Sequence, residues 1–513
     1  MRQFLGLSIL VVLGLTACQP KEDTQKFYYT PEKEGITYTE CETEEENYTI
    51  ECGYITIPEN RDKTDSRLIT LPFKVIKSPK PTGAPIFHLN GGPGASNMDY
   101  RPDVRILENH DVVLVGFRGV DGMSRLDCDN MFQSAGDGLF SEASIAKTGE
   151  SITSCVEGLR KKGFDLDGYT MVEVIDDMEF ARTQLNYPRI HLVSASYGTR
   201  LAQIYAYRYP ESISRSLMVS VNPPGHFVWE PETLDRQIEY YSELCKQDPY
   251  CSSRTPDLAA TVRNVMHNMP SSWLFFPIDR DRVRMAAFMG LYHRGSSASV
   301  FDVFIEAEQG DASGLAMVSM MFDYQISGLD FSWGDSYAKA FPDFNPQRDY
   351  GADMAVNNSI IGSPGSQLFA SMSAWPGKDL DSIYYDVQPS DVDMLLLSGN
   401  IDFSTPAEFA TEELMPYYSK SRQVILSEFG HTGDVMWYDR EAYVNLAKKY
   451  FDKGEVDTSL YDHEPMIFEP EMQFGRMAKI GLSLVVLVAI AVPILIWFTI
   501  RFIRRRRRRR QAG

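Results

Sequence analysis

Six short runs of apolar residues, each bounded by turn-forming residues, stand out along the chain. They show no alternation of apolar and polar positions, which is typical of strands buried on both faces of a parallel sheet. The stretches 174–185 and 201–209 carry apolar residues at helical spacing and predict helices. The pattern predicts an α/β fold whose mostly parallel sheet is flanked by helices, with strands at 85–89, 112–115, 190–193, 217–221, 394–397 and 424–426.

Two further strands are predicted before these runs, at 53–58 and 68–76, separated by charged turn residues. Between residues 221 and 394 the pattern changes, because segments rich in Met, Phe, Ser and acidic residues show helical spacing instead. This region of about 170 residues predicts a helical insertion that serves as a lid or cap. We expect a core in two parts, 38–224 and 386–455, with the cap at 225–385.

Methionines are concentrated in two stretches of the insertion, 285–289 and 315–321. Methionine is flexible and polarizable, and it fills irregular gaps and lines adaptable surfaces. The stretches therefore indicate core packing or a pliable pocket wall rather than a cofactor site.

The N-terminus has the pattern of an export signal. A short basic start precedes the apolar stretch 4–15, which is too short to span a bilayer comfortably. Small residues then lead to Cys18, as in the processing box of bacterial lipoproteins. We expect a signal peptide at 1–17, lipidation of Cys18 and a polar tether at 18–37; an ordinary signal peptide with an incidental cysteine is the alternative.

The C-terminus predicts a membrane span. Residues 480–500 contain no charge, and at ~1.5 Å per residue they cover roughly 31 Å, the thickness of a hydrocarbon core. A linker at 456–479 precedes them and an arginine-rich tail at 501–513 follows. The positive-inside rule favours a cytoplasmic tail over a nucleic-acid-binding one. We expect a protein of the bacterial inner membrane, bound to lipid through Cys18 and 480–500, with its body on the periplasmic or extracytoplasmic face.

Composition and charge agree with a folded, exported protein. The 513 residues are 43% hydrophobic, which excludes a disordered chain, and the formal net charge is −20 although eight arginines lie near the C-terminus. A body this acidic repels phosphates, so nucleic acid is not expected as a partner.

Seven cysteines are present, and assigning Cys18 to lipid leaves an even number for a disulfide-permissive compartment. Several connectivities are possible, and nearness in the sequence favours Cys41 with Cys52, Cys128 with Cys155, and Cys245 with Cys251. No CxxC or histidine-rich pairing is present, so neither a metal nor another cofactor is expected.

Ser196 is the candidate nucleophile. The motif Ser194-Ala-Ser-Tyr-Gly198 directly follows the predicted strand 190–193 and precedes a predicted helix. A strand, a sharp turn and a helix form a nucleophile elbow, in which the residues two before and two after the nucleophile must be small. Gly198 obeys the pattern, and Ser194 stands where a glycine is usual.

A glycine-rich loop at 90–94 follows another predicted strand and lets backbone N–H groups approach a reacting group. Such a loop supplies one donor for a developing oxyanion, and the residue after the nucleophile, Tyr197, supplies the other. Pro93 has no N–H, so the loop donor is Gly91 or Gly92, and we favour Gly92.

Asp402 and His431 complete the candidate site. Each follows a predicted strand and has a glycine close by. The chain order Ser196, Asp402, His431 is that of α/β-hydrolases. His431 would take the proton of Ser196, and Asp402 would orient the imidazole and stabilise its charged form.

These motifs together resemble the tripeptidyl aminopeptidase and prolyl iminopeptidase family of α/β-hydrolase serine peptidases. The resemblance rests on the loop 90–94, the stretch 116–124, the segment 196–210 and the segment from Asp402 to His431, together with the Cys41 and Cys52 region. It covers about 38–225 and 385–450. Gly116, Asn90 and Ser194 depart from the family's strictest patterns, and none of them belongs to the triad.

The resemblance implies an aminopeptidase that cleaves peptides near a free N-terminus by serine acyl-enzyme chemistry. Carboxylates of the cap bind the substrate amine in this family, but the sequence does not identify them here. A carboxylesterase or lipase with the same triad remains an alternative, because the fold does not separate ester from amide substrates. A non-catalytic envelope scaffold is a further alternative.

Overall fold

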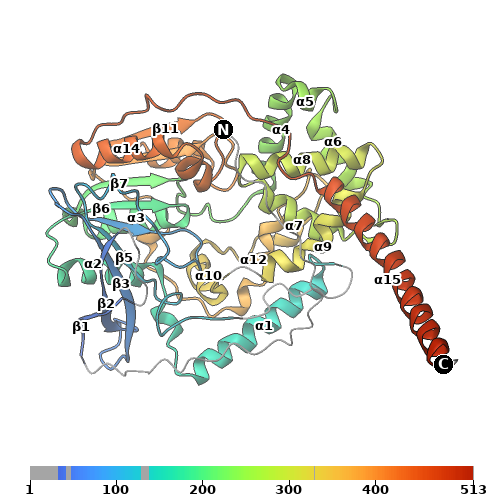
Figure 1. Ribbon diagram of the computed structural model, residues 1–513. Coiled ribbons are helices and arrows are strands. Elements are labelled where there is room, and N and C mark those ends of the chain that lie inside the picture. Colours follow the sequence, from blue (N-terminus) through green and yellow to red (C-terminus); the bar gives the residue numbers. More distant parts are fainter. Residues whose placement is uncertain (1–32, 42–47, 129–137, 328–329, 512–513) are drawn as a thin grey trace.

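The computed structural model describes residues 33–41, 48–128, 138–327 and 330–511, so the predicted signal peptide and Cys18 lie outside the described residues. A nine-stranded sheet runs through one half of the body in the order β1-β2-β3-β5-β4-β6-β7-β10-β11 (Figure 1). Its strands are β1 (Gly35–Thr39), β2 (Thr49–Pro58), β3 (Leu68–Lys77), β4 (Ile86–Leu89), β5 (Val112–Val115), β6 (Ile190–Ala195), β7 (Ile213–Val219), β10 (Met394–Gly399) and β11 (Ser421–Leu426).

The pairing is antiparallel from β1 to β5 and parallel from β5 to β11. This confirms the predicted mostly parallel sheet. The two strands predicted at 53–58 and 68–76 belong to β2 and β3, and the structure places them in an antiparallel part of the same sheet. The sheet begins at Gly35, inside the stretch that was expected to be tether, because β1 pairs with β2 from Gly35 to Thr39. Edge strand β1 is partly exposed, which explains why its sequence does not read as a buried strand.

Both faces of the parallel strands are covered. Along β5, Val113 and Val115 face a core shared with helices α1 (Glu142–Lys161), α2 (Met171–Gln184) and α3 (Tyr197–Arg208). Val112 and Leu114 point to the opposite face, where α14 (Arg440–Lys453) packs. The carboxyl ends of the parallel strands therefore meet along one edge between two helical layers.

The insertion between β7 and β10 is helical and lies beside the sheet in Figure 1. In its last third, Tyr337, Tyr350 and Phe369 are buried in the core that the sheet shares with α1, α2 and α3. Apolar residues from Leu234 to Phe322 form a second hydrophobic core. Chain segments 466–468 join this core, because Met466 and Phe468 are buried in it. The main helices and strands of the insertion are α4 (Pro231–Gln247), α5 (Pro249–Ser252), α6 (Leu258–His267), the hairpin β8 (Ser272–Trp273) and β9 (Phe276–Pro277), α7 (Arg280–Gly290), α8 (Arg294–Glu308), α9 (Ser313–Ser327), α10 (Trp333–Ala340), α11 (Tyr350–Met354) and α12 (Gln367–Ala370).

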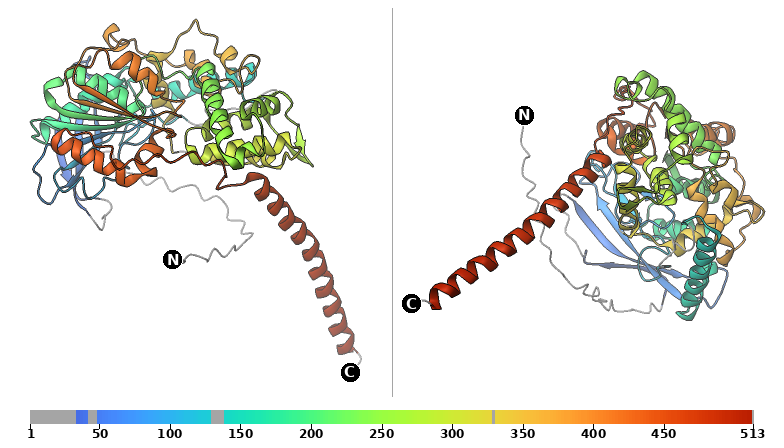
Figure 2. Two further views of the ribbon diagram at one scale, coloured as in Figure 1. Left: turned by 90° about the horizontal axis from the view of Figure 1, so that it is seen from above. Right: turned by 90° about the vertical axis from the view of Figure 1, so that its right-hand side faces the viewer.

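The long helix α15 (Phe474–Gln511) leaves the body beside α9 and extends away from it (Figures 1 and 2). Its segment Phe474–Arg508 is long and apolar enough to cross a membrane, and an 18-residue window within it has a mean hydropathy of 2.8. The helix begins six residues before the apolar span predicted from Ile480. Its first turns are held by the insertion, since Lys479 pairs with Asp311 and the Ser313 hydroxyl donates to the Gly475 carbonyl at 3.3 Å.

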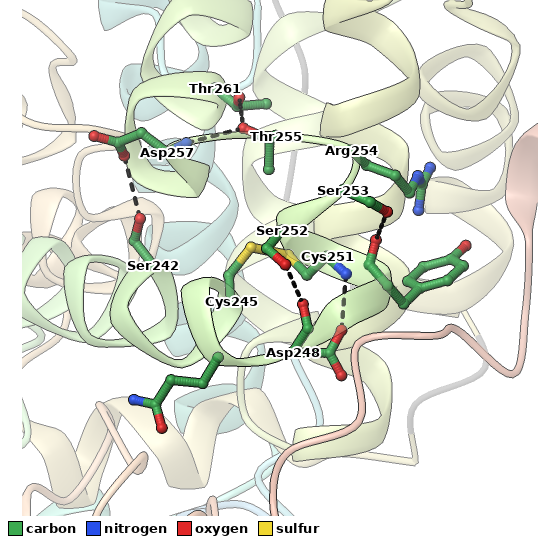
Figure 3. The surroundings of a disulfide bond; sticks show 12 residues. Ser242, Cys245, Asp248, Cys251, Ser252, Ser253, Arg254, Thr255, Asp257 and Thr261 are labelled. Carbon is green, nitrogen blue, oxygen red and sulfur yellow. Dashed lines mark hydrogen bonds between the residues drawn. A yellow bond between two sulfur atoms is a disulfide. The ribbon is translucent and has the colours of Figure 1, made fainter.

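Three disulfides are present, and they are the pairs that nearness in the sequence favours: Cys41–Cys52, Cys128–Cys155 and Cys245–Cys251. The last one joins α4 to the short helix α5 (Figure 3). Asp248 caps that helix by accepting from the Cys251 N–H at 2.7 Å. The bridge therefore fixes a tight corner of the insertion.

Removing a disulfide should cost more stability when the bridge closes a longer loop, because the loop entropy grows with the logarithm of the loop length. The loop-entropy relation gives about 3.5 kcal/mol for Cys128–Cys155, which spans 27 residues, and about 2 kcal/mol for Cys245–Cys251, which spans 6. Paired Cys→Ala variants, compared by urea unfolding, measure these losses, and non-reducing peptide mapping checks the pairing. An equal or larger loss at Cys245–Cys251 would contradict the loop-entropy ranking.

Candidate active site

Ser196 lies in the turn between β6 and α3, with backbone angles φ 53° and ψ −128°. A non-glycine residue with positive φ is strained by about 1–3 kcal/mol, and such strain persists only where the surroundings enforce it. Here the Ser196 N–H donates to the Val219 carbonyl at 2.9 Å. Ser194 fits where a glycine is usual, since its side chain is buried and its hydroxyl contacts the Leu217 carbonyl at 3.4 Å.

The structure brings the three predicted side chains together at the carboxyl ends of β6, β10 and β11. The Ser196 Oγ lies 2.9 Å from the His431 Nε2, and the His431 Nδ1 lies 2.8 Å from the Asp402 Oδ2. Asp402 and His431 are both buried. This is the geometry in which an imidazole can remove the serine proton while a carboxylate orients it.

Asp402 is held as a charged acceptor. Backbone N–H groups of Ser404 and Thr405 each donate to its Oδ1 at 3.0 Å, and the Thr405 hydroxyl donates to its Oδ2 at 2.6 Å. Burial alone would raise the pKa of the Asp402 carboxyl. The charge of His431 and these hydrogen bonds outweigh burial and hold that pKa below its ordinary value.

The loop that carries His431 is fixed by the insertion. The His431 N–H donates to the Tyr292 carbonyl at 2.7 Å, and the Tyr292 ring stands edge-on to the imidazole at 5.2 Å. Asp434 accepts from the backbone N–H groups of Gly430 and Arg294, both at 2.8 Å. Tyr292 and Asp434 were not predicted as site residues, because neither belongs to a local motif.

The glycine-rich loop that includes the predicted donor Gly92 lies against Ser196, and Tyr197, the other predicted donor, follows Ser196 directly in the chain. Gly91 is in close contact, since a Cβ on it would lie 2.8 Å from the Ser196 Cβ, and its N–H is taken up by the Asn90 side chain at 2.9 Å. Within the described ranges, the N–H groups of Gly92 and Tyr197 donate to no other residue. Gly92 has φ 119°, a conformation that suits glycine.

Helix α10 of the insertion and the residue before it contact both segments that carry the predicted oxyanion donors, the loop at 90–94 and Tyr197. The Ser336 hydroxyl donates to the Pro93 carbonyl at 2.5 Å, and the Ser332 N–H donates to the Gly94 carbonyl at 2.9 Å. On the other side, the buried Tyr197 hydroxyl donates to the Lys339 carbonyl at 2.9 Å. A cap that merely covered the site would not make these contacts, so α10 is part of the site's framework.

A buried ion pair lies inside this framework. The Lys339 Nζ is 2.5 Å from the Asp335 Oδ1 and 3.2 Å from the Arg118 carbonyl, and both side chains are almost fully buried. Burial raises the pKa of the Asp335 carboxyl to about 6. Lys339 thus holds α10 against the loop after β5, since it pairs with Asp335 on the helix and donates to the Arg118 carbonyl in the loop.

Three further buried residues, Arg118, His88 and His191, have structural roles. Arg118 is fully buried, pairs with Asp177 at 2.7 Å and donates to the Glu59 carbonyl at 2.6 Å, which ties the N-terminal module to α2. Burial lowers the pKa of His88 to about 4 and that of His191 to about 3, so both are neutral core residues. Across the described residues, no group of three or more His, Cys, Asp or Glu side chains is placed to hold a metal ion.

Two protein families match the chain. The α/β-hydrolase fold matches residues 84–299, which include Ser196, and a family described as TAP-like protein matches residues 359–462, which include Asp402 and His431. The chain has the α/β-hydrolase fold, and its segment 359–462 is similar to TAP-like proteins. The helical insertion occupies the long gap in the sequence between Ser196 and Asp402.

Similarity to individual proteins is more distant. The tripeptidyl aminopeptidases of Streptomyces lividans and Streptomyces coelicolor are each 25% identical over 210 residues, which are 37% of this chain. The chain spans 39% of the length of these two relatives. Among solved structures, a serine hydrolase from Cycloclasticus zankles is 14% identical with a TM-score of 0.35, covering 79% of this chain and 100% of that one.

Replacing Lys339 should reveal the role of the buried ion pair. Lys339→Met leaves the Asp335 carboxylate buried without its cation, a change that typically costs about 3–5 kcal/mol of the free energy of unfolding. The pKa of Asp335 in the folded protein, about 6, lies above the value for an unfolded chain, so protonation of Asp335 favours the folded state. The destabilisation by the unpaired carboxylate therefore grows as pH rises through about 6. The loss should therefore be larger at pH 7.5 than at pH 4.5.

Urea unfolding at the two pH values measures this difference, with exposed Lys147→Met on α1 as the control. The double variant Asp335→Leu/Lys339→Met should regain most of the stability, because it buries no charge. A pH-independent loss in Lys339→Met, or a double variant as unstable as the single one, would contradict the ion-pair interpretation.

Proposed function

We propose that the protein is a serine aminopeptidase, anchored in a membrane, that cleaves peptides near a free N-terminus. The observation that carries the proposal is the contact of the Ser196 Oγ with the His431 Nε2 at 2.9 Å in a chain with a TAP-like segment. The triad contacts supply what acyl transfer by a serine requires. A purely structural envelope protein has no need of them.

In the proposed reaction, the Ser196 Oγ attacks the scissile carbonyl while the His431 Nε2 accepts the serine proton. The N–H groups of Gly92 and Tyr197 bind the oxyanion, and α10 holds both segments in position. His431 then donates its proton to the leaving amine. Water, activated by the same imidazole, releases the acyl group from Ser196.

Two features support a peptide substrate with a free end. The named relatives of known activity are tripeptidyl aminopeptidases. The insertion also contacts the site from two sides, through Tyr292 and through α10, and such a cover favours chain ends over the middle of a folded chain. Glu230, near the start of the insertion, is paired with Arg348 at 3.2 Å and is not assigned to the substrate amine.

The proposed location is the bacterial inner membrane, with the catalytic body on the extracytoplasmic face. The apolar helix α15, the arginines that follow its apolar part and the three disulfides support this arrangement. Lipidation of Cys18 would add a second anchor, and a single lipid signal by itself holds a protein only weakly.

The nucleophile is tested with a fluorophosphonate probe. Ser196→Ala should abolish labelling, while the neighbouring Ser194→Ala should retain labelling because its hydroxyl faces the Leu217 carbonyl rather than His431. His431→Ala should lower peptide hydrolysis by several orders of magnitude, since the triad acts as a unit. Labelling of Ser196→Ala at the wild-type level would rule out Ser196 as the nucleophile.

Specificity is tested by comparing matched substrates. A peptide with a free amine should be cleaved much faster than its N-acetylated form, and activity on the free peptide should fall as pH rises through about 8, where the amine loses its charge. Activity should also fall at acidic pH, where a protonated imidazole cannot accept a proton. Equal rates for free and acetylated peptides would contradict the aminopeptidase, and a preference for short acyl esters would instead identify an esterase.

A further inference from the structure

A cavity of about 260 Å³ lies between helices α7, α8 and α9 and the beginning of α15. Among the described side chains, none that lines the cavity is charged, and Ser296 and Ser299 are the lining residues that carry hydroxyl groups. The Ser296 hydroxyl donates to the Gly290 carbonyl at 2.6 Å. The walls are otherwise aliphatic, aromatic or methionine side chains, among them Val283, Val300, Val303, Met321, Met472 and Phe474. Such a cavity suits an apolar ligand.

The cavity lies where the chain enters the proposed membrane span. Phe474, the first residue of α15, forms part of its wall, and six residues separate Phe474 from Ile480, where the uncharged stretch begins. At ~1.5 Å per residue this is about 9 Å, close to the thickness of one lipid headgroup layer. Once α15 spans a bilayer, as proposed above, the cavity lies at the level of the headgroups.

The surface around the cavity exposes large apolar side chains. Leu274 and Phe275, at the tip of the β8–β9 hairpin, are 64% and 74% exposed, and Met320 on α9 and Met472 are 43% and 51% exposed. Helix α9 packs against both this hairpin and α15, so these side chains share one neighbourhood. Exposed apolar residues beside a membrane helix are typical of a surface that contacts lipid.

We propose that this cavity binds an acyl chain of a membrane phospholipid. A dry apolar cavity of about 150 Å³ is known to hold benzene, so this one has room for roughly ten carbon atoms. The favourable free energy of binding would come from filling the cavity, because the atoms that line it otherwise lack van der Waals contacts on one side. The methionines of the wall, Met289, Met321 and Met472, can adapt to a flexible chain.

The proposed lipid site touches the active site through one turn. Gly290 lines the cavity, and the residues that follow it lead to Tyr292, whose carbonyl accepts from the His431 N–H at 2.7 Å. The Ser296 hydroxyl, in the cavity wall, donates back to Gly290 and closes this turn. A bound acyl chain would therefore pack behind the turn that positions the histidine.

The test uses the full chain in nanodiscs of phospholipid that carries a photoactivatable acyl chain. After irradiation, mass spectrometry should find cross-links within residues 480–500 and also at cavity residues such as Met321 and Phe474. Ser196→Ala should give the same cross-links, which separates this result from the outcome of the catalytic tests.

Filling the cavity provides the decisive comparison. Ala286→Phe and Val300→Phe should each lower cavity cross-linking by about tenfold, the change that 1.4 kcal/mol of lost binding produces. The control, Ala146→Phe on the exposed face of α1, should leave it unchanged. Fluorophosphonate labelling and thermal unfolding verify that each variant is folded.

Three results would overturn the proposal. Cross-links confined to 480–500 would leave the membrane anchor intact and remove the lipid site. An absence of cross-links everywhere would remove both. Unchanged cross-linking in the filled variants, together with a raised KM for peptides, would assign the cavity to the substrate.

Discussion

The close approach of α3 to the loop after β4 is the constraint on which the site depends. A Cβ on Gly198 would lie 2.1 Å from the Leu89 carbonyl oxygen and 2.7 Å from that of Asn90, so no side chain fits there. This contact places the first turn of α3 directly against the glycine-rich loop. Ser196, two residues earlier, has its strained backbone angles in the same turn, and its hydroxyl projects toward His431.

The insertion holds segments of the candidate active site in position in addition to covering it. Tyr292 receives the backbone N–H of His431, and α10 fastens the segments of Pro93 and Tyr197. The contacts with His431 and Tyr197 use backbone carbonyls of the insertion, whereas the contact with Pro93 needs the Ser336 hydroxyl. A change of side chain at Tyr292 can therefore leave its backbone contact in place, but a change at Ser336 removes the contact with the glycine-rich loop.

Much of the fold is readable from the sequence because its strands are buried on both faces. All six apolar runs became strands within a few residues, and Ser196, Asp402 and His431 could be singled out because each follows such a run beside a glycine. These are local signals. The predicted span at 480–500 lies within α15, but the residues of α15 before Ile480 were not predicted to be helical, because they include Arg476 and Lys479 and are held by tertiary contacts with the insertion.

The residues of the site that the sequence did not predict contact partners that are distant in the sequence. Tyr292 meets His431, Lys339 meets Arg118, and Ser336 meets Pro93, so that each contact joins segments more than a hundred residues apart. No periodicity or motif marks such a residue, because its partner is brought to it by the fold. Asp434 lies near His431 in the chain, yet its role depends on the backbone of Arg294.

The attachment of α15 to the insertion has a mechanical consequence. Helix α15 packs on α8 and α9, and the segment before it is held by the same body, since Arg294 donates to the Pro465 carbonyl at 2.9 Å. In a membrane-bound protein the sheet would therefore be connected to the membrane span through the insertion. A force on α15 would reach the catalytic residues through the contacts that the insertion makes with His431, Pro93 and Tyr197.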